Sequence, residues 1–343
     1  MTEQDQATAP EPSNQADPAK ELTDLTGSAI KEQTLDSFNS LGWTKVIAPA
    51  KVNLLLSIGD RQSDGYHQAT SLMHALNIHD VLYMRRAWAD PESGLVVRLS
   101  CTGVGDIEAP DVDPADNLAA QAVTELAARL GRAEDEAIEI RIEKNIPCQA
   151  GLGGGSADAA AALIGAAHLW GVGPADPAIE ASARALGADV AFFLRGGCGL
   201  YAGVGDAFDR ALAPMKKPVV LVKPDGGVST AQAYATFDEN STPTSAEALD
   251  AAATAASAAD VVLANNLAPA AEALMPELAM VRTWLAEQPG VEQTLLSGSG
   301  AATFAICDSL EAALAVVAAA RKRGWWARST SFGSLRAAIV PQG

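Results

Sequence analysis

The chain has 343 residues, and its 48% hydrophobic and 19% charged residues are typical of a soluble globular protein long enough for two domains. The formal net charge of −18 argues against nucleic acid or an anionic membrane as a partner, because both attract basic surfaces. The four cysteines are scattered without a C-x-x-C pair, which favours reduced thiols in a cytoplasmic protein over disulfides or a zinc site.

Residues 1–42 differ in composition from the rest of the chain. They hold eight acidic residues and only two lysines, with few side chains that a core could bury. The segment lacks both the apolar stretch of a secretory signal and the arginines of a transit peptide. We therefore expect a mostly disordered acidic extension.

The pattern of residues 43–215 predicts the first folded domain. A strand-like run at 43–59, interrupted near Pro49, leads to a tight turn at 63–67 that contains an Asp-Gly pair. Hydrophobic periodicity then predicts strands at 76–84 and 95–101, a helix at 117–130, a half-buried strand around 138–142, and helices at 156–170 and 176–186.

The pattern of residues 216–343 predicts a second domain, which follows a candidate hinge at 213–218 between two prolines. The expected elements are a strand at 219–224, a helix at 229–237, helix over 244–275 except around 264–269, a helix at 276–287, two strands within 293–307, a helix at 309–323 and a strand at 327–333. Helices and strands do not alternate as they do in a doubly wound sheet, so the fold class is α+β.

The glycine-rich stretch "IPCQAGLGGGSADAAAAL", residues 146–163, precedes one of the predicted helices. Unpaired N–H groups at a helix N-terminus attract anions, so such a loop can bind phosphate. It is not a Walker A loop, because no lysine precedes Ser156, and it is not a Rossmann fingerprint, because Ser156 occupies the place of the last glycine. Two interpretations remain: the amides from Gly153 to Ala157 bind a di- or triphosphate, or the loop is a packing turn.

Three segments together resemble the motifs of the GHMP kinase superfamily: "PAKVNLLLSI…SDGYH", "IP…AGLGGGSADAA" and "LLSGSGAATFAI". The similarity extends from about residue 44 to the end of the chain. It implies the two-domain GHMP kinase fold, with the active site in the cleft between the domains.

The first motif is most similar to the branch of this superfamily that acts on 4-diphosphocytidyl-2-C-methyl-D-erythritol. The resemblance implies a cytoplasmic enzyme, a monomer or homodimer, that phosphorylates the 2-hydroxyl of this small molecule with ATP in the non-mevalonate route to isoprenoid precursors. Two alternatives stay open: another small-molecule acceptor such as homoserine, mevalonate or a sugar, and a non-catalytic ligand-binding member.

The resemblance also assigns the catalytic pair, Lys51 and Asp189. Asp189 would accept the proton of the acceptor hydroxyl, while Lys51 would keep that carboxylate ionised and attract the transferring phosphoryl group. Without the resemblance, the two residues could equally be a solvated strand lysine and a helix-end aspartate. The ATP-binding residues implied by the second motif are Gly151, Leu152, Gly153, Gly154, Gly155, Ser156 and Ala157.

The acceptor is expected to contact the first and third motifs. Tyr66 would stack on the cytosine and His67 would bind its edge, while Tyr234 or Phe237 would close the other face. The remaining substrate-binding residues are Asn53, Ser297, Gly298, Ser299 and Gly300, although the last four could form only a strand bend.

Mg²⁺ should accompany ATP, with Ser156 as a weak protein ligand, because the sequence shows no acidic cluster dedicated to a metal.

Two residues depart from the family pattern. Ala157 stands where Ser or Asn is usual, and Ala191 stands where proline is usual. Neither change removes a group that the chemistry requires.

Overall fold

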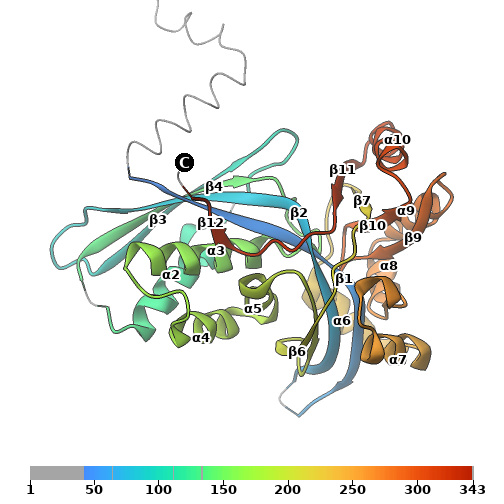
Figure 1. Cartoon of the computed structure of the whole chain (residues 1–343), viewed down its shortest axis with the longest axis horizontal. Helices are drawn as coiled ribbons and strands as arrows, with labels where there is room; N and C mark the ends of the chain where they lie inside the picture. Colours follow the sequence, from blue (N-terminus) through green and yellow to red (C-terminus); the bar gives the residue numbers. More distant parts are fainter. Residues whose placement is uncertain (1–41, 64, 111, 133, 342–343) are drawn as a thin grey trace, which may run out of the picture. The chain divides into compact units, whose positions relative to one another are not determined.

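The computed structural model describes residues 42–341 apart from 64, 111 and 133 (Figure 1). The expected disordered extension over 1–42 therefore lies almost entirely outside the described residues. Residues Thr44–Gly343 form one structural unit, which is described here by itself. The expected domain boundary at 215/216 remains a prediction.

The longest strands, β1 (Thr44–Arg61) and β2 (His67–Ala87), form an antiparallel hairpin whose turn lies where the Asp-Gly pair predicted it. The expected interruption near Pro49 is a shift in register between Pro49 and Lys51, because proline has no N–H for the ladder. The strand continues through this bulge. The predicted strand at 76–84 is thus only the middle of β2.

This hairpin is the centre of a large mixed sheet with the order β12-β1-β2-β4-β3. β3 (Leu95–Gly103) and β4 (Glu136–Lys144) pair in parallel, and helix α2 (Leu118–Arg129) lies between them in the chain. Four short strands that the sequence did not predict complete the sheet: β5 (Cys198–Ala202), β6 (Ala207–Leu212), β8 (Ala264–Asn265) and β12 (Ala338–Ile339).

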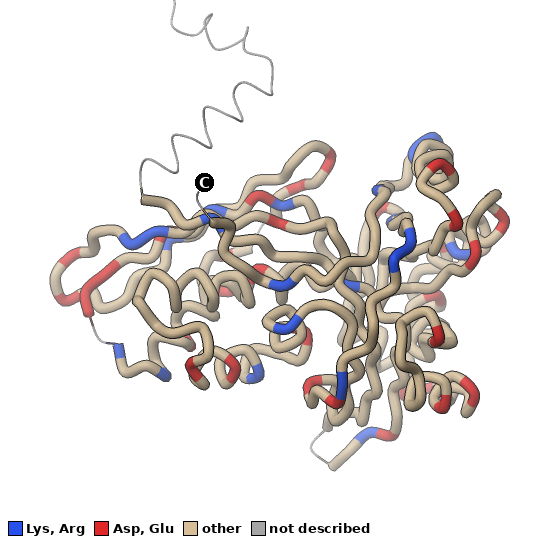
Figure 2. The backbone as a smooth tube through the Cα atoms, in the orientation of Figure 1, with Lys and Arg blue, Asp and Glu red and all other residues tan. Residues whose placement is uncertain are grey.

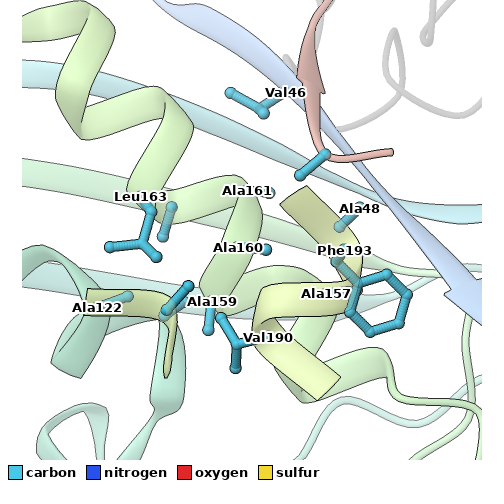
Figure 3. Packing of buried hydrophobic residues seen from close by; sticks show 14 of the residues in the cluster. Val46, Ala48, Ala122, Ala157, Ala159, Ala160, Ala161, Leu163, Val190 and Phe193 are labelled. Atoms are coloured by element: carbon cyan, nitrogen blue, oxygen red, sulfur yellow. The ribbon is translucent and has the colours of Figure 1, made fainter. Parts of the chain in front are cut away.

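Helices α2, α3 (Gly154–Leu169), α4 (Pro177–Leu186) and α5 (Ala188–Arg195) gather on one face of the large sheet (Figure 1). Helix α3 is central, and its alanines are buried on every side, as Figure 3 shows for Ala157 and Ala159–Ala161. A helix that is apolar all round must be buried, and small side chains let the sheet and the other helices approach it closely. The alanine run therefore fixes the N-terminus of α3 within the fold.

A smaller antiparallel sheet with the order β11-β7-β10-β9 forms in the second half of the chain. Its strands are β7 (Pro218–Lys223), β9 (Val291–Leu296), β10 (Thr303–Cys307) and β11 (Trp326–Ser331). Helices α9 (Glu277–Ala286) and α10 (Leu310–Arg321) pack on it through a shared apolar core. These elements match the sequence predictions closely.

The expectation of helix over 244–275, with a break around 264–269, is wrong for residues 255–263, which are not α-helical, whereas strand β8 lies inside the expected break. The chain forms α7 (Ala246–Thr254) and α8 (Ala268–Leu274), but a 3-10 turn at Ala258–Asp260 and strand β8 separate them. Asn266 hydrogen-bonds the backbone of Ile58 in β1, which draws this segment out of a helix. Tertiary contacts thus override the helix propensity of alanine.

Within the part of the chain that the structure describes, no helix is both long and apolar enough to cross a bilayer. The remaining helix, α6 (Thr230–Glu239), begins after Ser229, whose side chain caps it. In the view of Figure 2, Lys and Arg are interspersed with Asp and Glu along the chain.

Candidate active site

The side chains of Lys51 and Asp189 meet as an ion pair. Lys51 lies in β1 immediately after the bulge, and its Nζ is 3.4 Å from Oδ2 of Asp189. Asp189 is in the first turn of α5, where a carboxylate is stabilised by the positive end of the helix. The lysine side chain is only 5% exposed, whereas the aspartate is 35% exposed and accessible to a ligand.

A chain of hydrogen bonds orients Lys51. Its Nζ donates to Oδ1 of Asn53 at 2.6 Å, and Nδ2 of Asn53 donates to Oγ of Ser71 at 2.9 Å. The backbone N–H of Lys51 also donates to the carbonyl of Leu152 in the glycine loop at 3.0 Å. The ammonium group is therefore fixed next to both Asp189 and the loop.

The glycine loop ends at the N-terminus of α3. Gly153 is the cap residue, with φ of 73° and no side-chain cap, so the first N–H groups of a 16-residue helix have no capping partner from that residue. A Cβ on Gly153 would lie 2.7 Å from Cζ of Phe193, and one on Gly151 would lie 2.0 Å from the carbonyl oxygen of Ser297. Glycine is required at both positions by conformation and by space.

The third motif supports this loop from the second half of the chain. The hydroxyl of Ser297 donates to the carbonyl of Gly151 at 2.9 Å. Asn265 donates through Nδ2 to the carbonyls of Leu296 and Gly298, at 2.9 and 2.8 Å. Ser297 is fully buried, so its side chain holds the loop.

A cavity of about 1020 Å³ adjoins all these groups. Lys51, Asn53 and Asp189 line it together with the glycine loop. Further lining residues come from the segment 108–118, which leads into α2, and from the segment around α6: Val228, Ser229, Thr230 and Tyr234. The cavity thus places an ion pair, a helix N-terminus and apolar walls in one space, which suits transfer of a phosphoryl group to a bound alcohol.

Comparison with protein families supports this interpretation. The model of the GHMP kinases N terminal domain matches residues 117–197, and the model of the GHMP kinases C terminal domain matches residues 245–324. The 4-diphosphocytidyl-2-C-methyl-D-erythritol kinase of Desulfitobacterium hafniense (strain Y51) is 39% identical over 82% of this chain and 93% of that protein. The chain belongs to the GHMP kinase superfamily. Its place within the superfamily is with the 4-diphosphocytidyl-2-C-methyl-D-erythritol kinases.

Solved structures agree with this placement. A crystal structure of 4-(cytidine 5'-diphospho)-2C-methyl-D-erythritol kinase is 31% identical, with a TM-score of 0.67 over 84% of this chain and 99% of that chain. The homoserine kinase from Cytophaga hutchinsonii is 22% identical, with a TM-score of 0.63 over 87% and 97%, and shows the shared fold. The expected α+β GHMP kinase fold is confirmed.

Most of the residues expected at the site of this GHMP kinase line the cavity: Lys51, Asn53, Asp189, Gly151–Ser156 and Gly298–Gly300. Ala157 and Ser297 are fully buried and do not line it. Tyr66 and His67 do not line it either. Tyr66 is 66% exposed, and the imidazole of His67 is bound to Asp238, whereas Tyr234 from α6 does line the cavity.

Sequence reasoning missed a buried charged cluster beneath the loop. Nζ of Lys144 contacts both Asp80 and Asp158, and the latter contact is 2.5 Å. Asp80 also accepts the backbone N–H of Ile146 at 2.8 Å, so the cluster anchors the start of the glycine loop. Only the position of Lys144, directly before the second motif, gave a signal.

Burial dominates the electrostatics of this cluster. Desolvation raises the pKa of Asp158 to about 7, although the charge of Lys144 opposes the shift. Burial alone would lower the pKa of Lys144, but Asp158 and Asp80 raise it above its ordinary value. Lys144 is therefore a permanent cation shared by two carboxylates.

The donor groups near the loop suit a metal ion carried by the nucleotide better than a metal held by the protein alone. Among the described residues, no group of three or more His, Cys, Asp or Glu side chains is arranged to hold a metal. Ser156 lines the cavity, and Oδ1 of the buried Asp158, one half-turn further along α3, has no hydrogen-bond partner. Oxygen donors of this kind are the ones that Mg²⁺ prefers.

Proposed function

We propose that this GHMP kinase transfers the γ-phosphoryl group of ATP to the 2-hydroxyl of 4-diphosphocytidyl-2-C-methyl-D-erythritol, a step of the non-mevalonate route to isoprenoid precursors. The observation that carries the proposal is the Lys51–Asp189 pair, 3.4 Å apart on a cavity that the glycine loop also lines. The names of the relatives supply the acceptor.

The glycine loop would bind the phosphates of ATP. The N-terminus of α3 carries a partial positive charge, and the loop from Gly153 to Ser156 allows the nucleotide to approach the backbone closely. This arrangement explains how a chain with a net charge of −18 can hold a polyanion: the binding is local.

Asp189 and Lys51 would carry the chemistry. Asp189 accepts the proton of the acceptor hydroxyl while that oxygen forms a bond to the γ-phosphorus, and the bond from phosphorus to the bridging oxygen of ADP breaks. Lys51, oriented by Asn53, attracts the negative charge of the transferring group. Mg²⁺ bound with ATP would neutralise part of the phosphate charge, and Ser156, which lines the cavity, would be its weak protein ligand.

The walls around α6 would hold the cytidine diphosphate part of the acceptor. Tyr234 offers an aromatic face on the cavity, and Thr230 is joined to Ser299 by a hydrogen bond of 2.9 Å between their hydroxyls. The cavity of about 1020 Å³ has to hold the phosphates of ATP as well as the acceptor, because the glycine loop and the residues around α6 line the same space.

A coupled assay of ADP release tests the proposal directly. The purified chain is offered ATP, Mg²⁺ and one acceptor at a time: the cytidyl-linked methylerythritol, methylerythritol phosphate, homoserine or mevalonate. We expect rapid turnover with the first acceptor alone, and phosphorus NMR should place the new phosphate on the 2-hydroxyl. Efficient turnover of homoserine or mevalonate would overturn the proposal in favour of another GHMP kinase activity.

A further inference from the structure

We propose that Asp238 is a positioning residue of the acceptor site, which clamps the end of the β1–β2 hairpin against α6. Arg61 and His67, the last residue of β1 and the first of β2, define this hairpin end. The inference rests on the proposed function, because it assigns the wall formed by α6 to the acceptor.

One carboxylate binds both residues of the hairpin end. Nε2 of His67 lies 2.6 Å from Oδ1 of Asp238, and a nitrogen of the Arg61 guanidinium lies 3.6 Å from Oδ2. Arg61 and His67 are paired across the hairpin, so Asp238 fixes two opposed strand ends at once. Arg61 also donates to the carbonyl of Gly65 at 3.2 Å, which ties the guanidinium to its own turn.

The two contacts differ in burial. The imidazole of His67 is only 7% exposed, whereas the side chain of Arg61 is 62% exposed. Exposed ion pairs contribute little because water and salt screen them, and the carboxylate of Asp238 is itself 32% exposed, so the shorter contact with the better-buried partner contributes more. The His67–Asp238 contact is therefore the main part of the clamp.

The clamp reaches the cavity through Tyr234. Asp238 follows Tyr234 by four residues on α6, so both side chains lie on the same face of the helix. The ring of His67 packs against Tyr234, with centroids 5.4 Å apart, and meets Phe237 edge-on at 6.2 Å. His67 thus buttresses the aromatic ring that lines the cavity, and Asp238 holds His67 in place.

The clamp is separate from the groups proposed to bind ATP. Neither Asp238 nor His67 lines the cavity, and neither contacts the glycine loop through any hydrogen bond found among the described residues. Loss of the clamp should therefore weaken binding of the acceptor and leave binding of ATP unchanged. A carboxylate that served only general stability would not separate the two substrates.

Kinetics of Asp238→Ala and Asp238→Asn test the inference. Asparagine keeps an oxygen that can accept from Nε2 of His67 but removes the charge that attracts Arg61. We expect Asp238→Ala to raise the KM for the cytidyl-linked acceptor by roughly tenfold or more, the scale of a lost charged hydrogen bond. The KM for ATP and kcat at saturating acceptor should stay within about twofold, which is below the effect of one such bond. Asp238→Asn should retain most of the wild-type affinity.

The matched control is Glu272→Ala. Glu272 on α8 pairs with Arg282 on α9 at 2.6 Å and is 17% exposed, and it does not line the cavity. This variant should leave both KM values unchanged. The double variant His67→Ala/Asp238→Ala should be no worse than His67→Ala alone, because Asp238 acts on the wall of the cavity through His67.

Trypsin provides a readout that does not depend on the acceptor. Cleavage after Arg61 should be faster in Asp238→Ala than in the unmodified protein or in Glu272→Ala, because the hairpin end is no longer held on α6. Unchanged acceptor KM in Asp238→Ala overturns the inference, whatever the cleavage rate. If the unmodified protein does not phosphorylate the cytidyl-linked acceptor, the proposed function fails and the acceptor role of Asp238 fails with it. Normal wild-type turnover with an unaffected Asp238→Ala variant overturns the inference alone.

Discussion

Nζ of Lys51 lies 3.4 Å from Oδ2 of Asp189, although one residue comes from strand β1 and the other from helix α5. Nζ of Lys51 also donates a hydrogen bond of 2.6 Å to Oδ1 of Asn53. In the proposed mechanism, the Lys51–Asp189 pair provides one base and one cation at a single point.

Removal of the base gives the first prediction. Asp189→Ala should lower kcat by at least about a hundredfold, the scale of general base catalysis, because Asp189 is the carboxylate that pairs with Lys51 on the cavity. ATP affinity, measured by calorimetry, should change little, since Asp189 is not part of the glycine loop. Turnover near the wild-type value would remove Asp189 from the mechanism.

Two substitutions in the glycine loop should have different effects, one on ATP affinity and the other on stability. Gly155 is exposed on the cavity, and the nearest atom to an added Cβ is Cδ1 of Leu118 at 4.0 Å, so Gly155→Val should fold normally. Its side chain would occupy space that the phosphates need, and ATP affinity should fall by at least about tenfold. Gly153→Ala should instead lower the melting temperature, because its φ of 73° and the ring of Phe193 exclude a methyl group. Normal ATP binding by Gly155→Val would show that the loop is only a packing turn.

The buried cluster beneath the loop predicts a pH dependence of stability. Burial raises the pKa of Asp158 to about 7 in the folded chain, above the value of about 4 expected after unfolding. The folded state therefore binds a proton that the unfolded state releases between these values. The resulting stabilisation is present below about pH 4 and is lost as the pH rises through about 7.

Asp158→Asn tests this dependence, because asparagine has the same shape without the titration. Urea unfolding at about pH 5 and about pH 7.5 should show the variant gaining stability relative to the unmodified chain at the higher pH. Asp250→Asn serves as the control, because Asp250 on α7 is an exposed carboxylate outside the cluster. A stability difference for Asp158→Asn that stays constant with pH would contradict the assignment.

The sequence predicted the elements that hydrophobic periodicity and caps determine locally. Helices α2, α6 and α10 begin within two residues of their expected positions, since Asn117, Ser229 and Ser309 each cap a helix through the side chain. The short strands β8 and β12 could not be predicted, because their pairing partner, β1, lies far away in the chain. Tertiary pairing, and not local propensity, makes them strands.

The residues of the site also divide into those that the sequence predicted and those that only the structure shows. The resemblance to the superfamily indicated Lys51, Asp189 and the glycine loop, and the structure brings all three to one cavity. Asp80 gave no such signal, because it lies within β2 and meets Lys144 and the backbone of Ile146 only in the folded chain. The first motif also indicated His67, but only the structure shows that the imidazole of His67 is hydrogen-bonded to Asp238.

The last prediction separates the two tyrosines that could contact the cytosine. Tyr234 lines the cavity, whereas Tyr66 is 66% exposed and does not line it. A stacked base contributes roughly 1–3 kcal/mol, so Tyr234→Ala should raise the acceptor KM about five- to 150-fold and leave the ATP KM unchanged. Tyr66→Ala should raise the acceptor KM less than Tyr234→Ala does. Methylerythritol phosphate, which has no cytosine, should be a poor acceptor for the unmodified chain and should be used equally poorly by Tyr234→Ala. A larger effect of Tyr66→Ala than of Tyr234→Ala would show that the β1–β2 turn, and not α6, recognises the base.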